Sequence, residues 1–358
     1  MTKDYSRFLP QTSKTPTKPQ ETPPLQALGW QAFFAQQTGL DEISQTPPAR
    51  VVAVHRNGLH IRGDRIEATI PPGLDATVGD WLLFDASRPA QSRVLRRKSL
   101  FKRRAPGTDR RLQLIAANVD TALIVSSCNQ DFNIARLERY MALCFEAEVT
   151  PVVVLTKADL CDDPHPYVDQ AQSISDNAEV LAVDARSGEA AEALEPWCKT
   201  GQTLAVLGSS GVGKSTLVNA LMGAETAATR AIREDDSKGR HTTTHRQLHM
   251  LGCGACILDT PGMRELQLTD AETGLATVFG DIDDLATQCR FSDCSHQSEP
   301  GCAVKGAIDQ GVLDPDRIRR WRKLVAEEQF NAASLAERRA KDKAFGKLVR
   351  TVMKNKPR

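Results

Sequence analysis

One short segment of this 358-residue chain has the residue types and spacing that could bind the phosphates of a nucleoside triphosphate. Residues 203–221 read TLAVLGSSGVGKSTLVNAL, in which the pattern G-x-x-x-x-G-K-S begins at Gly208 and ends at Ser215. An apolar strand pattern precedes the loop and an amphipathic helix pattern follows it, which is the context that a phosphate-binding loop needs. We expect the loop N–H groups to surround phosphate oxygens, Lys214 to reach the β- and γ-phosphates, and the Ser215 hydroxyl to bind Mg²⁺. The loop residues expected to contact the nucleotide are Gly208, Ser209, Ser210, Gly211, Val212, Gly213, Lys214, Ser215 and Thr216.

A second segment has the residue types that distinguish guanine from adenine. The pattern (N or T)-K-x-D is matched by Thr156, Lys157, Ala158 and Asp159, which follow the apolar run PVVVL. The Asp159 carboxylate can accept hydrogen bonds from guanine N1–H and from the exocyclic amine, while the Lys157 stem packs on the ring. Adenine would leave this charged acceptor unpaired, at a loss of roughly 1.5–3 kcal/mol.

The loop after the next apolar run differs from the usual GTPase pattern. Where GTPases carry S-A-K or S-A-L, this chain has Asp184, Ala185 and Arg186. Only the Ala185 N–H is carried over, as the donor that we expect to bind the guanine carbonyl oxygen.

Two later segments would complete a magnesium-dependent hydrolytic site. Residues 238–245 read KGRHTTTH, and GTPases place here a Thr that closes on Mg²⁺ and the γ-phosphate. Three consecutive Thr residues leave this ligand open, and we favour Thr243. Residues 259–262 (DTPG) follow an apolar run as a D-x-x-G segment. Asp259 is expected to hold Mg²⁺ through water, and the Gly262 N–H is expected to sense the γ-phosphate.

The group that would orient the attacking water is not the usual one. Many GTPases follow D-x-x-G with Gln, whereas Gly262 is followed by Met263, whose thioether cannot orient water. Intrinsic turnover is therefore expected to be slow. We expect His245 to orient the water, with His241 as the second candidate and a loop histidine without a role as the alternative.

The guanine-reading segments precede the phosphate-binding loop, which reverses the order found in ordinary GTPases. They begin at residues 156 and 184, whereas the phosphate-binding loop begins at 208 and D-x-x-G at 259. A circular permutation is physically allowed when the original termini lie close together and the new ones fall at a loop. The sequence therefore predicts a circularly permuted GTPase domain.

Cysteine and histidine residues cluster after residue 270. The spacing C-x4-C-x-H-x5-C places three thiolates and one imidazole within fourteen residues, at Cys289, Cys294, His296 and Cys302. Such a closed set suits one structural zinc ion in a tetrahedron of protein ligands. Cytosolic cysteines without a metal are the alternative.

Charge and composition exclude several classes of protein. The formal net charge is +1, but nine Lys/Arg and one acid lie between Arg93 and Arg111, and fourteen Lys/Arg and six acids lie between Leu313 and Arg358. These two basic stretches suggest contact with a polyanion, with a solvated helix face as the alternative for the second. Long apolar runs and a signal-peptide core are lacking, and nine cysteines do not predict a disulfide framework. We therefore expect a cytoplasmic protein without membrane contact.

The spacing of apolar residues predicts a multidomain chain. Residues 50–95 hold four or five short strand patterns with turn signals such as Asn57-Gly58, which fit a small β-barrel; an OB-fold and an SH3-like barrel remain open. From residue 118 strand and helix patterns alternate, which predicts a doubly wound, mostly parallel α/β sheet. The expected parts are a disordered tail (1–25), a helix plus barrel (26–98), a permuted P-loop GTPase domain (99–269), a zinc-binding domain (270–312) and a basic helical tail (313–358).

Together these motifs resemble the ribosome small-subunit-dependent GTPase A family (RsgA/YjeQ type). The resemblance covers residues 50–310 and is carried by T-K-x-D, G-S-S-G-V-G-K-S-T, G-R-H-T-T-T-H, D-T-P-G and C-x4-C-x-H-x5-C in that order. The stretch QLIAANVDTALIV, residues 113–125, is similar to that family's approach to its GTPase domain. The resemblance implies an N-terminal OB-fold, a permuted GTPase domain and a zinc domain, with a role in late maturation of the 30S subunit and its 16S rRNA.

Two functions of different class follow from these residues and from the family resemblance. The first is a GTP hydrolase that binds the small ribosomal subunit as a monomer, alternates between GTP and GDP, and uses hydrolysis to drive its own release. The second is a nucleotide-gated RNA-binding module with negligible turnover. A P-loop kinase for a small metabolite lacks support, because a kinase has no need of T-K-x-D.

We predict that Asp159→Asn shifts nucleotide preference from guanine toward xanthine, because the amide presents a donor where the carboxylate presented an acceptor. Binding of fluorescent GDP and XDP to the variant and to the unchanged protein measures the shift. Unchanged GTP affinity in Asp159→Asn would remove the assignment of the guanine site.

Overall fold

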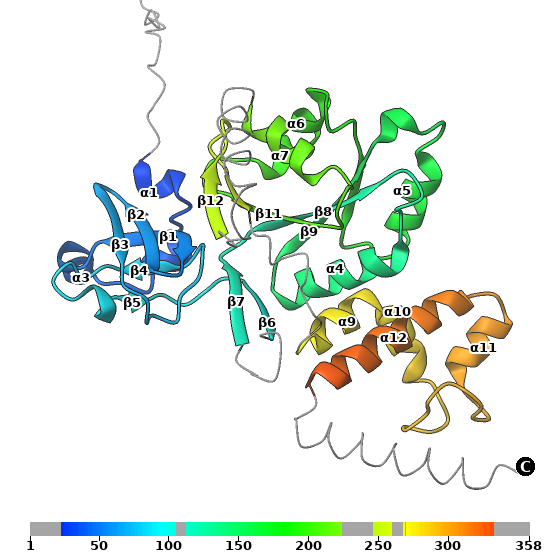
Figure 1. Ribbon diagram of the computed structural model, residues 1–358. Helices are drawn as coiled ribbons and strands as arrows, with labels where there is room; N and C mark the ends of the chain where they lie inside the picture. The colour runs from blue at the N-terminus through cyan, green and yellow to red at the C-terminus, as the bar shows by residue number, and fades with distance from the viewer. Residues whose placement is uncertain (1–22, 105–111, 224–245, 260–267, 269, 333–358) are drawn as a thin grey trace, which may run out of the picture.

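The computed structural model describes residues 23–104, 112–223, 246–259, 268 and 270–332. Figure 1 shows three parts: an N-terminal unit of short helices and strands, a central unit in which helices cover a sheet, and a C-terminal unit of helices. We define them as the N-terminal unit (23–98), the central unit (99–259) and the C-terminal unit (268–332).

The N-terminal unit is built on short antiparallel strands. Its elements are α1 (Pro24–Ala27), α2 (Ala32–Ala35), α3 (Leu40–Gln45), β1 (Pro48–His55), β2 (Gly58–Gly63), β3 (Ile66–Ile70), β4 (Trp81–Leu83) and β5 (Arg93–Val94). The strands pair in the order β3-β2-β1-β4-β5. The predicted hairpin is confirmed, but its turn is Arg56-Asn57 and not Asn57-Gly58, because Gly58 already pairs with His55. Gly58 has φ +150°, and an added Cβ would lie 2.1 Å from the Ile70 carbonyl oxygen, so a side chain is excluded there.

The central unit has the predicted alternation of strands and helices. Its strands are β8 (Thr121–Ser127), β9 (Thr150–Thr156), β10 (Glu179–Ala182), β11 (Thr203–Leu207), β12 (Arg246–Met250) and β13 (Cys256–Asp259). Their order is β10-β9-β8-β11-β13-β12, parallel throughout except that β12 is antiparallel to β13. Helices α4 (Ile134–Glu146) and α5 (His165–Gln172) cover one face, and α6 (Glu189–Ala193) and α7 (Lys214–Met222) the other (Figure 1). The prediction of a doubly wound, mostly parallel sheet is confirmed.

The stretch before β8 is not one strand. β7 (Leu112–Ala117) pairs with β6 (Leu100–Arg104) in a separate two-stranded sheet, and β8 begins at Thr121. Between them Asn118 has φ +55°, and its side chain donates to the Gly79 carbonyl at 3.0 Å and accepts from the Lys98 N–H at 2.8 Å. The strand expected from residue 118 therefore starts later, because Asn118 has a left-handed conformation and its side chain is hydrogen-bonded to the N-terminal unit.

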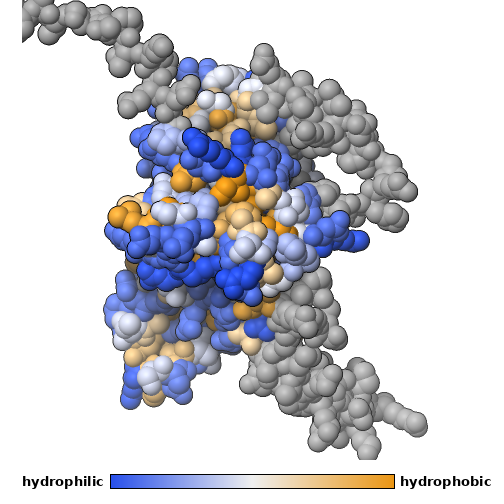
Figure 2. Space-filling model, turned by 90° about the vertical axis from the view of Figure 1, so that its left-hand side faces the viewer, coloured by the Kyte–Doolittle hydropathy of each residue, from blue (hydrophilic) through white to orange (hydrophobic). Residues whose placement is uncertain are grey.

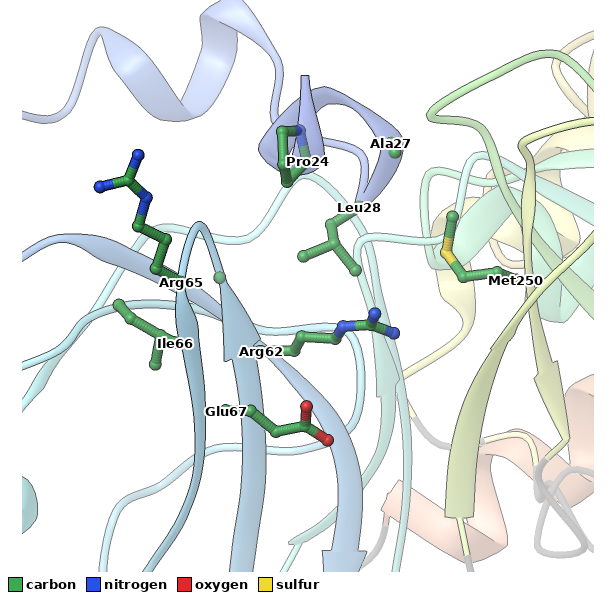
Figure 3. Close-up of a pocket in the computed structure, with 9 residues that line it drawn as sticks. Pro24, Ala27, Leu28, Arg62, Arg65, Ile66, Glu67 and Met250 are labelled. Atoms are coloured by element: carbon green, nitrogen blue, oxygen red, sulfur yellow. The ribbon is translucent and has the colours of Figure 1, made fainter. Parts of the chain in front are cut away.

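Strand β1 continues the central sheet beyond β12. Ala53 pairs with Gln247, and Val54 with Arg246. Beside this seam a pocket of about 500 Å³ opens between α1, the β2–β3 hairpin and β12, with Met250 contributed by β12 (Figure 3). Figure 2 views the side that carries the N-terminal unit, where apolar residues gather in the centre and hydrophilic residues surround them.

One buried arginine holds the N-terminal unit against the central unit. Arg50 is 1% exposed, and it donates to the carbonyl oxygens of Gly79 and Asn118, each at 3.2 Å, and to that of Leu28. Its guanidinium lies 5.7 Å from the centre of the Trp81 ring. Burial lowers the pKa of Arg50. Carbonyl groups from three separate segments therefore take the place of a single carboxylate partner.

The C-terminal unit packs on α4. Its helices are α9 (Glu272–Val278), α10 (Gly280–Ala286), α11 (Ala303–Asp309) and α12 (Pro315–Ala332). Gly274 lets α9 approach α4 closely, since an added Cβ would lie 2.0 Å from the Ala142 carbonyl oxygen. The Gly274 N–H donates to the Glu146 carboxylate at 3.0 Å. The part of the expected basic tail beyond residue 332, like most of the expected N-terminal tail, lies outside the described residues.

The start of α12 is bound to the central unit by ion pairs. Arg320 donates from Nε to both carboxylate oxygens of Glu138 at 2.9 Å, and Glu138, on α4, is fully buried. Arg317 pairs with Asp281 at 2.8 Å and lies 3.6 Å from Glu138. We expected this stretch to offer its cations to a polyanion. For Arg317 and Arg320 that expectation is corrected, because both side chains form ion pairs with carboxylates of the same chain.

The first basic stretch is compensated in part. Four of its cations pair with carboxylates of the same chain: Arg93 with Glu42, Arg97 with buried Asp80, Lys98 with Asp120, and Lys102 with Asp270. The high local count of Lys and Arg therefore reflects contacts between elements as well as surface charge. In the part of the chain that the structure describes, no helix combines the length and the apolar character needed to cross a bilayer.

We predict that Glu138→Gln lowers the free energy of unfolding by about 2–4 kcal/mol, because Arg320 would lose its charged partner in a buried interface. Chemical denaturation followed by circular dichroism measures this loss. Glu179→Gln, at the exposed start of β10, is the matched control and should change stability by less than about 0.5 kcal/mol. Equal midpoints for the two variants would show that the ion pair contributes nothing to stability.

Candidate functional site

The parallel strands of the central sheet all end at the same edge. These ends are Ser127, Thr156, Ala182, Leu207 and Asp259. In open α/β sheets ligands bind outside the carboxyl ends of the strands. The segments predicted to read guanine and to bind phosphate directly follow three of these ends, so the fold brings them together although they are far apart in the sequence.

The phosphate-binding loop has backbone conformations that its glycines permit. Gly208, Gly211 and Gly213 have φ +137°, +81° and +91°, and helix α7 begins directly after Gly213. An added Cβ on Gly208 would lie 2.3 Å from the Val125 carbonyl oxygen, so the loop lies tightly against β8. The Lys214 ammonium donates to the Ser209 carbonyl oxygen of the same loop. Ser210, Gly211, Ser215 and Thr216 are exposed, as a ligand-facing loop requires.

Thr156 joins the guanine segment to the phosphate-binding loop. Its side chain is completely buried, with Oγ1 2.6 Å from the Val212 carbonyl oxygen and 3.0 Å from the Ser126 carbonyl oxygen. A hydroxyl has one proton to donate, and the shorter distance favours Val212 as the acceptor. We expected Thr156 to contact the nucleotide; the structure turns its hydroxyl to protein carbonyls, while the residue still lines the base pocket.

A pocket of about 160 Å³ lies where the guanine base is expected. It is lined by Thr156, Lys157, Asp159, Leu160, Asp184, Ala185, Arg186, Gly213 and Thr216. Lys157 follows β9 and has a left-handed conformation, with φ +59°. The short turn Ala158–Leu160 comes next, and Asp159 of this turn lines the pocket. The predicted Asp159 and Ala185 thus face one cavity, whereas Leu160 and Arg186 were not predicted as site residues. Arg186 stands at the third position of the S-A-K pattern, so that comparison with other GTPases could have indicated it.

Asp184 organises the loop in place of the usual Ser. Its Oδ1 accepts from the Arg186 N–H at 2.9 Å, and its carbonyl oxygen accepts from the Ser187 N–H at 3.1 Å. This Asx turn fixes the backbone around Ala185, which is 5% exposed. The Arg186 guanidinium lies over the same pocket, where it donates to the Asp159 carboxylate.

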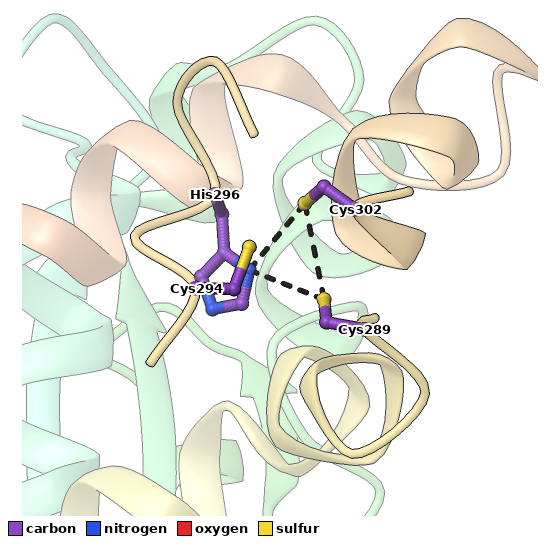
Figure 4. Close-up of side chains that lie close together, drawn as sticks. All are labelled: Cys289, Cys294, His296 and Cys302. Atoms are coloured by element: carbon purple, nitrogen blue, oxygen red, sulfur yellow. Dashed lines mark hydrogen bonds between the residues drawn. The ribbon is translucent and has the colours of Figure 1, made fainter. Parts of the chain in front are cut away.

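The four residues predicted as metal ligands form one cluster (Figure 4). The potential ligand atoms of Cys289, Cys294, His296 and Cys302 all lie within 4.8 Å of one another. His296 Nδ1 is 3.5 Å from the sulfur atoms of both Cys289 and Cys302, and those two sulfurs are 3.9 Å apart. The arrangement can hold a metal ion.

Neighbouring groups hold the loop that carries the cluster. The Glu299 carboxylate accepts from the Ser295, Gln297 and Ser298 N–H groups at about 3 Å, and the hydrogen bond with the Ser295 hydroxyl is the main reason why the pKa of Glu299 is lowered to about 2. A lowered pKa means that this contribution to stability is present above pH 4.5 and is lost as the pH falls toward 2. Arg322 of α12 donates to the His296 carbonyl oxygen. Sequence spacing gave no signal for either partner.

The residues predicted for catalysis lie outside the described part. These are Thr243, His245 and Gly262, together with His241; of Asp259 the strand position is described but not the side chain.

Comparisons with known proteins agree with this geometry. The RsgA GTPase family matches residues 94–269. The small ribosomal subunit biogenesis GTPase RsgA 2 of Vibrio parahaemolyticus is 50% identical over 336 residues, which cover 93% of this chain and 94% of that relative. The chain belongs to the RsgA GTPase family. Another member, from Mesorhizobium japonicum, is 48% identical over 318 residues, 87% of this chain and 91% of that protein.

Solved structures of similar fold support the permuted order of the RsgA GTPase. YjeQ from Thermotoga maritima matches with a TM-score of 0.56 and 26% identity, over 78% of this chain and 97% of that one. YloQ, described as a circularly permuted GTPase, matches in fold with a TM-score of 0.54 and 21% identity, over 80% of this chain and 96% of that one. The predicted family, the GTPase activity and the circular permutation are confirmed.

We predict that Thr156→Val weakens GTP binding about ten-fold or more. Valine keeps the shape of the side chain but leaves the Val212 carbonyl without its donor, which disturbs the phosphate-binding loop. Equilibrium binding of a fluorescent GTP analogue measures the effect. Thr150→Val, at the exposed start of the same strand, should bind as the unchanged protein does. Equal affinities for the two variants would exclude Thr156 as the link between the two halves of the site.

Proposed function

We propose that this RsgA GTPase binds the 30S ribosomal subunit through its 16S rRNA, assists late maturation of that subunit, and uses GTP hydrolysis to drive its release. Its relatives are named small ribosomal subunit biogenesis GTPases and cover nearly the whole chain. The observation that supports the nucleotide-binding part is the buried contact of Thr156 with Val212, which joins the wall of the proposed guanine pocket to the proposed phosphate-binding loop. The hydrolytic part is supported by the GTPase names of the relatives.

The residues of the proposed nucleotide site divide between base and phosphates. Asp159 and Lys157 would read and cover the guanine, with the Ala185 N–H toward its carbonyl oxygen. The loop N–H groups and Lys214 would bind the phosphates, and Lys214 would exchange the Ser209 carbonyl for phosphate oxygens.

The proposed magnesium site joins three segments of the chain. Ser215, Thr243 and Asp259 would hold the ion, which neutralises charge on the β- and γ-phosphates when bound. Gly262 would sense the γ-phosphate, and His245 would orient the attacking water.

The Cys/His cluster fits one structural zinc ion. With Zn–S of about 2.3 Å and Zn–N of about 2.0–2.1 Å, tetrahedral coordination requires sulfur atoms about 3.8 Å apart and sulfur–nitrogen distances of about 3.6 Å. The separations of 3.9 Å and 3.5 Å between Cys289, Cys302 and His296 meet this requirement. Four protein ligands leave no open position for a catalytic water, so the ion would stabilise the loop.

We also propose that the N-terminal strands form an OB-fold. The order β3-β2-β1-β4-β5, with β1 paired to both β2 and β4, supports a five-stranded Greek-key barrel. The proposed domains keep the boundaries 26–98, 99–269 and 270–312. A monomer in the cytoplasm, where ribosomes assemble, is part of the same proposal. The alternative of an RNA-binding module without turnover is not favoured, because the relatives are named GTPases.

We predict one zinc ion per chain in protein purified without chelator, measured by plasma mass spectrometry. Cys294→Ala should lose the metal and loosen the loop around it, because a fourth ligand is needed to close the site. Cys253→Ala, an exposed cysteine outside the cluster, should keep the full zinc content. A zinc content of zero in the unchanged protein would contradict the structural zinc.

We predict that 30S subunits strongly stimulate GTP hydrolysis, and that His245→Ala loses most of this stimulation but keeps GTP binding. Phosphate release with 30S, with 50S and with neither is the measurement. His165→Ala, an exposed histidine of α5, should respond to 30S as the unchanged protein does. Full stimulation in both His245→Ala and His241→Ala would instead indicate a water-orienting group supplied by the ribosome.

A further inference from the structure

We propose that Arg186 controls access of guanine to the base pocket: its guanidinium occupies the Asp159 carboxylate, and a guanine nucleotide binds by displacing it. The inference rests on the proposed role of Asp159 in reading guanine. It gives Arg186 a role in nucleotide affinity and in selectivity for guanine, which the S-A-K pattern of other GTPases does not predict.

The contact is direct and lies inside the pocket. The Arg186 Nη2 donates to Asp159 Oδ2, and the Arg186 Nε lies 3.5 Å from Asp184 Oδ1. All three residues line the same cavity. The Arg186 side chain is 64% exposed and that of Asp159 26%, so the cation covers the carboxylate from the solvent side.

The two ligands of Asp159 compete for the same oxygens. Guanine needs both carboxylate oxygens, one for N1–H and one for the exocyclic amine, whereas Arg186 already occupies Oδ2. Guanine replaces the lost donors with two of its own. Adenine cannot, so displacement of Arg186 by adenine leaves the carboxylate unpaired. Arg186 therefore competes with the binding of any base at Asp159, and only a base with the two donors of guanine can displace it favourably.

The loop allows the Arg186 side chain to move out of the pocket while its backbone stays in place. The Asp184 carboxylate holds the Arg186 N–H at 2.9 Å, which fixes the main chain of the turn. The exposed guanidinium can turn into solvent while Ala185 keeps its place in the pocket wall. Asp184 thus acts twice, as the organiser of the turn and as a second carboxylate near the displaced cation.

The test is nucleotide binding to Arg186→Gln, with Arg56→Gln on the exposed β1–β2 turn as the matched loss of one cation. Arg186→Gln should bind GDP and GTP about two- to five-fold more tightly, by the same factor for both, since an exposed ion pair of ordinary strength is removed from the competition. The gain should vanish near 1 M salt, where the ion pair is screened. Arg56→Gln should bind as the unchanged protein does.

A second pair of variants tests the effect of Arg186 in a protein that lacks the Asp159 carboxylate. In the background of Asp159→Asn, which lacks the charge that holds the cation, adding Arg186→Gln should leave XDP affinity unchanged. Weaker or equal GDP binding in Arg186→Gln, with guanine selectivity intact in the unchanged protein, overturns the inference. Equal binding of GDP and ADP by the unchanged protein would instead overturn the guanine site itself.

Discussion

The proposed nucleotide site depends on one buried hydrogen bond between segments that are 56 residues apart. The Thr156 hydroxyl donates to the Val212 carbonyl, and Gly213 leaves room for it, since an added Cβ there would lie 3.1 Å from Thr156 Oγ1. This contact places the base pocket at the side of the phosphate-binding loop. The parallel strands behind it fix the edge at which both must lie, so the order of the segments along the chain can change without changing the site.

The other two units are attached to elements that adjoin this site. β12 begins directly after His245, pairs with β13 on one side, and pairs with β1 of the N-terminal unit on the other. The C-terminal unit is bound to α4 through Glu138, and Arg322 of α12 also donates to the loop that carries the Cys/His cluster. Both outer units therefore contact strands or helices of the sheet that carries the proposed nucleotide site.

The parts that the sequence predicts are those in which chemistry is confined to a short segment. The phosphate-binding loop, the T-K-x-D segment and the Cys/His spacing each contain their own ligands and need only the correct flanking strand or helix. Contacts between distant segments could not be read in this way. The inward direction of Arg317 and Arg320, the pairing of β1 with β12, and the contact of Arg186 with Asp159 all depend on tertiary packing. A basic run has the same composition whether its charges meet RNA or buried carboxylates.

The most direct test is isothermal titration of the whole chain with GDP and with ADP in the presence of Mg²⁺. The account predicts one GDP bound per chain, and ADP binding weaker by about 10- to 150-fold, because adenine leaves the Asp159 carboxylate without donors. Equal affinity for the two nucleotides, or binding of neither, would contradict a guanine nucleotide site at this edge of the sheet.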